Sequence, residues 1–214
     1  MSRAPGFARD LAELIFGYGL ILLVLWTPGF PQTVLAPVAL LAALAVVLAR
    51  RPTLDELGLT RRGLAASWWI LPAAIVLSIA SLLIARHLGT LHSLYQGDLQ
   101  HIAGYILWTL YQQFLLNNYF MPRLTRVLSG PATAVTAAAI LFSAAHLPNL
   151  PLTAATLLWG VISCTLFRRY RNVYALGLAQ GLLGLCFAVC VPDAWHHHLK
   201  VGLGYWREFS PPGR

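Results

Sequence analysis

Most of the polar side chains that could do chemistry in the apolar part of this chain are amides. Four of them fall within seven residues of one apolar stretch, and a histidine and a fifth amide follow in later stretches: Gln112, Gln113, Asn117, Asn118, His146 and Gln180. An amide offers hydrogen bonds but has no useful basicity near neutral pH, whereas an imidazole can accept a proton. The set therefore predicts hydrogen-bonded recognition, with His146 as the candidate acid or base.

Gln113 and Asn117 are four residues apart, a spacing that places two side chains on one face of an α-helix. Amides in membrane helices commonly hydrogen-bond between helices, at about 1–2 kcal/mol or less per contact. Polar residues at membrane depth also mark functional sites. Interhelical bonding explains any single amide here, while convergence of several amides with His146 and Gln180 favours a pocket.

The elements that must position these residues are long apolar helices. Hydrophobic residues make up 58% of the chain, only 10% are charged, and the mean hydropathy is +0.67, outside the range of soluble globular domains. About 20 apolar residues are needed to cross roughly 30 Å of hydrocarbon. Seven stretches approach that length, at residues 11–26, 33–49, 63–85, 102–121, 132–145, 152–167 and 173–191. We therefore expect an all-α, polytopic membrane bundle of about seven transmembrane helices.

A single membrane-embedded domain is expected over residues 1–214, because no internal repeat or low-complexity linker divides the chain. The polar residues named above fall in a core at about 102–191. Residues 192–214 form a tail with Trp195, Tyr205 and Trp206, aromatic residues of the kind found at membrane interfaces. We expect this tail to lie along the outer interface.

The formal net charge of +8 comes from basic residues that flank the apolar stretches. Eleven of the fifteen Lys and Arg residues fall on one side of a seven-helix topology and four on the other. The positive-inside rule then predicts a cytoplasmic N-terminus, an external C-terminus and insertion in the inner or plasma membrane. A nucleic-acid partner is disfavoured, because the basic residues form no single stripe.

Three segments of the chain carry a resemblance to a known family. They are Gln112 to Leu124, which ends in Pro-Arg-Leu, then Phe-Ser-Ala-Ala-His-Leu-Pro-Asn at residues 142–149, and Ala-Gln-Gly-Leu-Leu-Gly at residues 179–184. Together they resemble the CPBP superfamily, the membrane proteins related to CAAX-prenyl endopeptidases and to bacteriocin-processing (Abi) proteins. The resemblance implies the helical fold of the CAAX proteases and an intramembrane, metalloprotease-like endopeptidase.

The chain departs from that family at its catalytic positions. The first motif, Glu-Glu-x-x-x-Arg, falls on Gln112, Gln113 and Asn117; the second, Phe-x-x-x-His, is intact as Phe142 and His146; and the third, His-x-x-x-Asn or Asp, falls on Gln180 and Gly184. In the family, the first-motif glutamate and the histidines are thought to activate water. Glutamine cannot do this, no other carboxylate is near in sequence, and His146 lacks an acid or a second histidine to fix its tautomer. Peptidase chemistry by the family mechanism is therefore not expected.

An uncharged, hydrogen-bonding cavity suits a lipid-like or prenylated ligand, a hydrophobic peptide or a membrane-protein partner. Its expected lining includes Phe142, Asn118, Tyr119 and Asn149. Two alternatives remain: a divergent but active CAAX-type endopeptidase, and a His-dependent membrane enzyme acting on a lipid-soluble substrate. In either, zinc or another divalent metal would be held by histidines, the candidates being His146, His196, His197 and His198.

Two further predictions concern the remaining histidines. The run at 196–198 is expected to be a solvated interfacial segment. The polar segment at residues 86–101 holds His87, His92 and His101 and is expected to be an external loop, in which a metal site is disfavoured because the spacing is irregular and Asp98 is the only acid.

Overall fold

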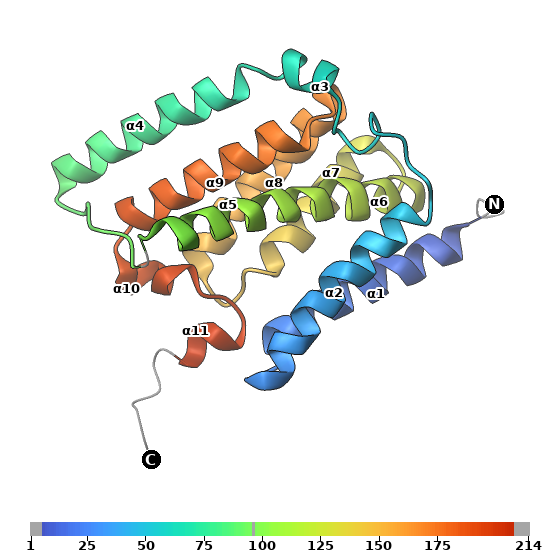
Figure 1. Ribbon diagram of the computed structural model, residues 1–214, viewed down its shortest axis with the longest axis horizontal. Helices are drawn as coiled ribbons and strands as arrows, with labels where there is room; N and C mark the ends of the chain where they lie inside the picture. The colour runs from blue at the N-terminus through green and yellow to red at the C-terminus, as the bar shows by residue number, and fades with distance from the viewer. Residues whose placement is uncertain (1–5, 96, 208–214) are drawn as a thin grey trace. The chain divides into compact units, whose positions relative to one another are not determined.

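The computed structural model describes residues 6–95 and 97–207, and over these residues every regular element is a helix (Figure 1). In chain order the elements are α1 (Phe7–Trp26), α2 (Phe30–Leu48), α3 (Arg61–Ala66), α4 (Ile70–Leu88), α5 (Leu99–Phe114), η1 (Leu115–Phe120), α6 (Met121–Val127), α7 (Pro131–Ala144), α8 (Leu150–Tyr170), α9 (Val173–Cys190), α10 (Asp193–His196), η2 (His197–Leu199) and α11 (Leu203–Arg207). The predicted all-α class is confirmed.

Four of the described helices, α2, α4, α8 and α9, are long and apolar enough to cross a membrane. The 20-residue α1 also has the length, but it carries Arg9, Asp10 and Glu13 in its first two turns. The 14-residue α7 is short for a span, and the stretch predicted at 63–85 breaks at residues 67–69 into α3 and α4. The chain is an integral membrane protein, and the number seven stays a prediction.

The described helices fall into two units, each of which packs internally. The first unit comprises residues 6–52, 115–164 and 200–207, and the second comprises residues 53–95, 97–114 and 165–199. The division falls at the junction of α5 with η1 and within α8. The single domain expected from the sequence stays a prediction.

In the first unit, α1 lies beside α2 and against α6 (Figure 1). Gly17 lets α1 lie close to η1, which leads into α6, because a Cβ at position 17 would meet the ring of Tyr119. The C-terminal segment is tied to the same unit by a hydrogen bond from the Gly202 N–H to the Leu147 carbonyl, 2.9 Å long. This unit therefore holds the second half of the first motif and the whole of the second motif.

In the second unit, α9 packs against both α4 and α5 (Figure 1). Asn172 starts α9 as its N-cap, because its side-chain oxygen accepts a hydrogen bond from the Ala175 N–H at 3.0 Å. The α9 sequence is apolar on nearly all sides, as expected of a helix surrounded by protein and lipid. It brings the third-motif position, Gln180, to the glutamines of α5.

Candidate functional site

The motif glutamines of the second unit are hydrogen-bonded to one another. Gln113 Nε2 donates to Gln180 Oε1 at 2.6 Å, and Gln180 Nε2 donates to Gln112 Oε1 at 2.5 Å. Gln113 is fully buried and Gln180 is buried. Amide-to-amide bonds of this kind bind α5 to α9, and they occupy the acceptor oxygens of Gln112 and Gln180.

Small residues let α5 and α9 approach closely around these amides. A Cβ at Gly177 would lie 2.7 Å from Leu110 Cα, and one at Gly181 would meet the side chain of Ile106. Gly177 and Gly181 are four apart, the spacing of small residues at membrane-helix interfaces. Thr109, fully buried, donates to the Gly177 carbonyl at 2.9 Å. The interface between α5 and α9, called the α5–α9 seam below, therefore consists of close backbone contacts as well as side-chain contacts.

Gly184 occupies the second position of the third motif, where the family carries Asn or Asp. A Cβ at this position would meet the hydroxyl of Tyr105 on α5. The room that a motif side chain would need is therefore filled by Tyr105. A polar residue could enter here only if the tyrosine turned away.

Asn117, Asn118 and Tyr119 lie in η1, a π-helical segment inside an otherwise α-helical run. All three are buried. π-helical turns within α-helices are rare and are frequent at functional sites. The expected shared face of Gln113 and Asn117 assumed α-helical pitch, and the two residues belong to different units, so that pairing stays a prediction.

His146 follows α7 and is buried. Its Nδ1 lies 2.7 Å from the Phe142 carbonyl, and because that oxygen can only accept, Nδ1 carries the proton and Nε2 is left as an acceptor. The Phe142 ring packs edge-on against the imidazole, with centroids 5.0 Å apart. The expectation that nothing fixes the tautomer of His146 was therefore wrong, since a backbone carbonyl four residues earlier fixes it.

Asn149 is fully buried at the start of α8. Its side-chain oxygen accepts from the Leu152 N–H at 3.2 Å, and its Nδ2 donates to the Lys200 carbonyl at 3.0 Å. These two bonds begin the helix and hold the C-terminal segment beside it. Asn149 therefore has a structural role, capping α8 and holding the C-terminal segment. Its contact with a substrate stays a prediction.

An open cavity of about 490 Å³ adjoins this segment in the first unit. It is lined by Leu147, Pro148, Leu150, Tyr205 and Trp206. Leu147 and Pro148 come from the second-motif segment, and the two aromatic residues come from α11. The volume lies in the range of ligand pockets, about 300–1,000 Å³.

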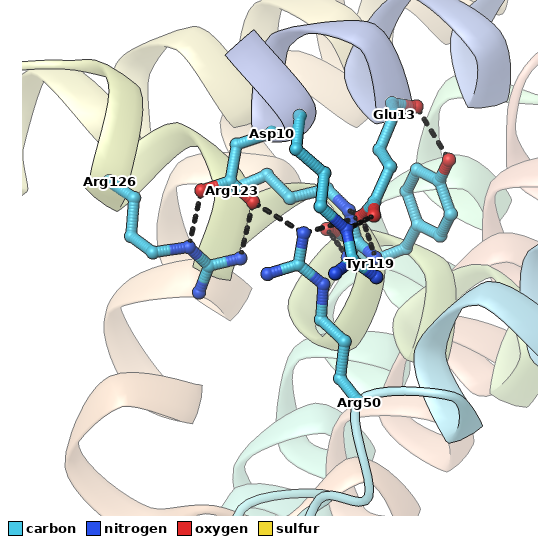
Figure 2. Close-up of polar contacts among 7 residues, drawn as sticks. Asp10, Glu13, Arg50, Tyr119, Arg123 and Arg126 are labelled. Atoms are coloured by element: carbon cyan, nitrogen blue, oxygen red, sulfur yellow. Dashed lines mark hydrogen bonds and ion pairs between the residues drawn. The ribbon is translucent and has the colours of Figure 1, made fainter. Parts of the chain in front are cut away.

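A cluster of charged side chains gathers at the N-terminal end of α1 (Figure 2). Asp10 is ion-paired with Arg126 and Arg50, each at 2.7 Å at the nearest atoms. Glu13 is ion-paired with three arginines: Arg123 at 2.7 Å, Arg50 at 2.8 Å and Arg9 at 2.9 Å. The cluster joins α1, the end of α2 and α6.

Arg123 connects this cluster to the motif-bearing helix. It is almost completely buried, its Nη1 donates to the Tyr119 carbonyl at 2.6 Å, and its guanidinium carbon lies 4.1 Å from the Tyr119 ring centroid. The Tyr119 hydroxyl in turn donates to the Glu13 carbonyl (Figure 2). Tyr119, expected to line a ligand cavity, is thus fully buried between α1 and Arg123.

Sequence reasoning assigned no role to Asp10 and Glu13, although a signal was present. Glu13 is a carboxylate inside the first predicted apolar stretch, and such a residue marks a functional or structural pairing by default. No short-range motif links it to Arg123, which lies 110 residues further along the chain. Glu13 is not available to replace the motif glutamate, because both of its carboxylate oxygens are paired with guanidinium groups.

A divalent metal does not fit the motif positions. Those positions supply one imidazole, His146, and no carboxylate or thiolate, which are the other ligand types that hold zinc in proteins. The amide oxygens of Gln112 and Gln180 each already accept a hydrogen bond from another glutamine.

The histidine run at 196–198 differs from its prediction. His196 is buried, with 1% of its surface exposed, so it is not part of a solvated segment. Burial lowers the pKa of His196. By contrast, a hydrogen bond to the Val191 carbonyl raises the pKa of His92, which comes from the polar segment before α5. The two histidines belong to the second unit, whereas His146 belongs to the first.

These features define a polytopic helical membrane protein with CAAX-protease motifs and altered catalytic positions. The family model described as type II CAAX prenyl endopeptidase Rce1-like matches residues 13–186, which is most of the chain. The chain belongs to this family, and the resemblance drawn from its three motifs is confirmed. No curated protein and no solved structure matches the chain.

Proposed function

We propose that this protein is a member of the CAAX prenyl endopeptidase family that lacks the glutamate-dependent peptidase mechanism. In its place it binds a lipid-like or prenylated ligand, or a hydrophobic segment of a membrane partner, without cleaving it. The observation that carries the proposal is the chain of hydrogen bonds from Gln113 through Gln180 to Gln112. Three motif positions that should supply acid, base and imidazole instead satisfy one another as amides.

The ion pairs of the two carboxylates in the apolar helices support the same proposal. Asp10 and Glu13 are the only acidic residues of the described apolar helices, and both are paired with arginines. A carboxylate held by guanidinium groups is stabilised as an anion and is a poor proton acceptor. Peptide hydrolysis by a carboxylate base therefore has no candidate residue within the described apolar helices.

The open cavity beside the second motif supports ligand binding. Its lining of Leu147, Pro148, Leu150, Tyr205 and Trp206 is mainly apolar, and the tyrosine hydroxyl and the indole N–H are the polar groups of its side chains. Such a lining is suited to an isoprenoid or acyl chain. The aromatic residues of α11 also suit the headgroup region of a bilayer.

One observation favours a second candidate, an active hydrolase that uses His146. The Phe142 carbonyl holds the imidazole as the Nδ1–H tautomer, which leaves Nε2 able to accept a proton. A histidine base of this kind would need no glutamate. The two candidates differ in whether a prenylated peptide leaves the protein intact or cleaved.

We infer from the distribution of basic residues that the N-terminus is cytoplasmic and the C-terminus external. Within the first unit, Arg9, Arg50, Arg123 and Arg126 meet at one cluster, and all four are among the eleven basic residues predicted on the cytoplasmic side. Protease protection of tags placed at each terminus in oriented vesicles tests this orientation. Exposure of both termini on one side would contradict it.

Native mass spectrometry of the detergent-purified protein with a farnesylated peptide tests ligand binding. Wild type is expected to retain the intact farnesylated peptide and to release its non-prenylated twin. Replacement of two lining residues, Leu147→Ser with Trp206→Ala, should abolish retention. Trp195→Ala removes an exposed tryptophan outside the cavity and is the matched control. Equal retention by all three proteins, or none by wild type, would contradict binding in this cavity.

A further inference from the structure

The polar segment between α4 and α5 is fastened to the end of α9. Thr90 Oγ1 donates to the Cys190 carbonyl at 2.8 Å, and the His92 N–H donates to the Val189 carbonyl at 3.1 Å. All of these residues belong to the second unit. The two bonds fix the position of the His92 side chain relative to the turn that leads from α9 into α10.

Two imidazoles converge on one carbonyl oxygen at this turn. His92 Nε2 lies 2.9 Å from the Val191 oxygen, and His196 Nε2 lies 2.8 Å from the same oxygen. The two rings are stacked, with centroids 6.2 Å apart and planes inclined by 17°. Because both nitrogens face the same oxygen, they also lie close to each other.

A carboxylate completes the cluster. Asp193 Oδ2 lies 3.8 Å from His92 Nδ1, and Asp193 Oδ1 lies 3.4 Å from His196 Nε2. One ligand atom from each of His92, Asp193 and His196 falls within 4.8 Å of the others. A fourth side chain is close at hand, since His198 Nδ1 lies 3.0 Å from Asp193 Oδ1.

The backbone beside this cluster adopts an unfavourable conformation. His197, His198 and Leu199 have φ angles of 47°, 50° and 60°, in the left-handed region that residues with a Cβ seldom adopt. Such conformations persist where the surrounding structure holds them, and they concentrate at functional sites. Stacking of the His198 ring on Tyr95, with centroids 3.9 Å apart, is one of the contacts that hold this segment.

We propose that His92, Asp193 and His196 form a binding site for Zn²⁺ or a similar transition-metal ion, with His198 able to supply a fourth ligand. Imidazole nitrogen and carboxylate oxygen are the donors that suit zinc, copper and nickel. The site is separate from the motif glutamines and from His146. A metal bound here cross-links the segment before α5 to the turn after α9.

The proton changes that accompany binding follow from the hydrogen bonds. His92 Nδ1 lies 3.0 Å from the Ser93 carbonyl, so the Nδ1–H can stay in place and orient the ring while Nε2 binds the metal. Both nitrogens of His92 face carbonyl acceptors, so a metal that binds Nε2 takes the place of the proton on that nitrogen, which passes to solvent. At His196 the remaining proton must move to Nδ1, which requires the 3.3 Å hydrogen bond from the Leu199 N–H to open.

Isothermal titration of the untagged, detergent-purified full chain with ZnCl₂, with metal analysis of the same sample after dialysis, tests the site. Wild type is expected to bind one equivalent of zinc. Asp193→Asn and His92→Gln should each weaken binding at least tenfold. His101→Gln should leave binding unchanged, because His101 pairs with Asp98 in an exposed histidine–carboxylate pair outside the cluster.

Two results would overturn the proposal: no stoichiometric zinc on wild type, or equal affinity in the Asp193→Asn, His92→Gln and His101→Gln proteins. Unfolding of each metal-free variant, followed by circular dichroism, shows whether lost binding reflects a lost fold. A zinc-induced rise in the unfolding temperature of wild type, absent from Asp193→Asn but present in His101→Gln, separates the site from unspecific binding.

Discussion

Arg123 buries its guanidinium against Glu13 and the ring of Tyr119, and this arrangement gives Arg123 a structural role in the first unit. Arg123 is part of the Pro-Arg-Leu sequence, which ends one of the three segments that resemble the family. In this protein its partner is a carboxylate from α1, and the pair fastens the motif-bearing helix to the N-terminal helix. The residue therefore contributes to the fold of the first unit.

Glu13→Gln is expected to destabilise the protein by about 3–5 kcal/mol, because it leaves the buried charge of Arg123 without its anion. Arg9→Gln is the matched control, since Arg9 pairs with the same carboxylate but is exposed; its loss should change stability by about 1 kcal/mol or less. Denaturant or thermal unfolding in detergent measures both. Equal effects of the two substitutions would contradict a buried ion pair at Arg123.

At the residue scale, the sequence indicated which polar residues of the apolar helices would be buried and bonded, but not which residues they contact. Gln112, Gln113 and Gln180 hydrogen-bond to one another between helices, whereas the pocket expected from their convergence with Asn117, Asn118 and His146 stays a prediction. The pairing of Glu13 with Arg123 was not foreseen, because it depends on how α1 packs and no local spacing encodes it. The tautomer of His146 was also missed, since its fixing partner is a backbone carbonyl and not a side chain.

At the scale of elements, the seam between α5 and α9 is the feature that assembles the altered motif positions. Glycines on α9 bring its backbone against α5, and the glutamine bonds and the Thr109 bond to the Gly177 carbonyl lie along this contact. The same closeness leaves Gly184 without space for a motif side chain. The altered motif positions on α5 and α9 therefore lie in a tightly packed helix–helix interface.

Gly177→Ala should destabilise the protein by about 1–3 kcal/mol, because the added Cβ would lie 2.7 Å from Leu110 Cα, a backbone atom that can move only with its helix. Gly104→Ala is the control, since a Cβ at Gly104 meets nothing within 4 Å and alanine favours the helix by up to about 1 kcal/mol. The unfolding temperatures of both variants check this. A neutral Gly177→Ala would contradict the close approach of α5 and α9.

Element boundaries were predictable only in part. Apolar runs located the long helices, but the break at residues 67–69 was missed although Pro72, in the first turn of α4, signals it: proline has no N–H for the Trp68 carbonyl four residues earlier. The π-helical pitch of η1 left no signal in the apolar pattern. The segment at residues 86–101 was expected to be a loop, but α4 extends to Leu88 and α5 begins at Leu99. Its attachment to the end of α9 rests on hydrogen bonds to backbone carbonyls that sequence periodicity does not reveal.

At the scale of the whole molecule, composition and three short motifs sufficed to predict an all-α membrane protein of the CAAX protease superfamily. The family match confirms this class, while the activity associated with the family depends on a few side chains that this chain replaces. The described helices are held together by apolar packing, close approach at glycines and ion pairs. None of these requires the catalytic glutamates.

Whether this family member cleaves peptides can be measured by incubating proteoliposomes of the full chain with a farnesylated CAAX peptide. An active family member serves as the positive control, and peptide products are quantified by mass spectrometry. We expect wild type to yield no more product than its His146→Ala variant. Cleavage by wild type that His146→Ala abolishes, in a variant that still folds, would contradict it.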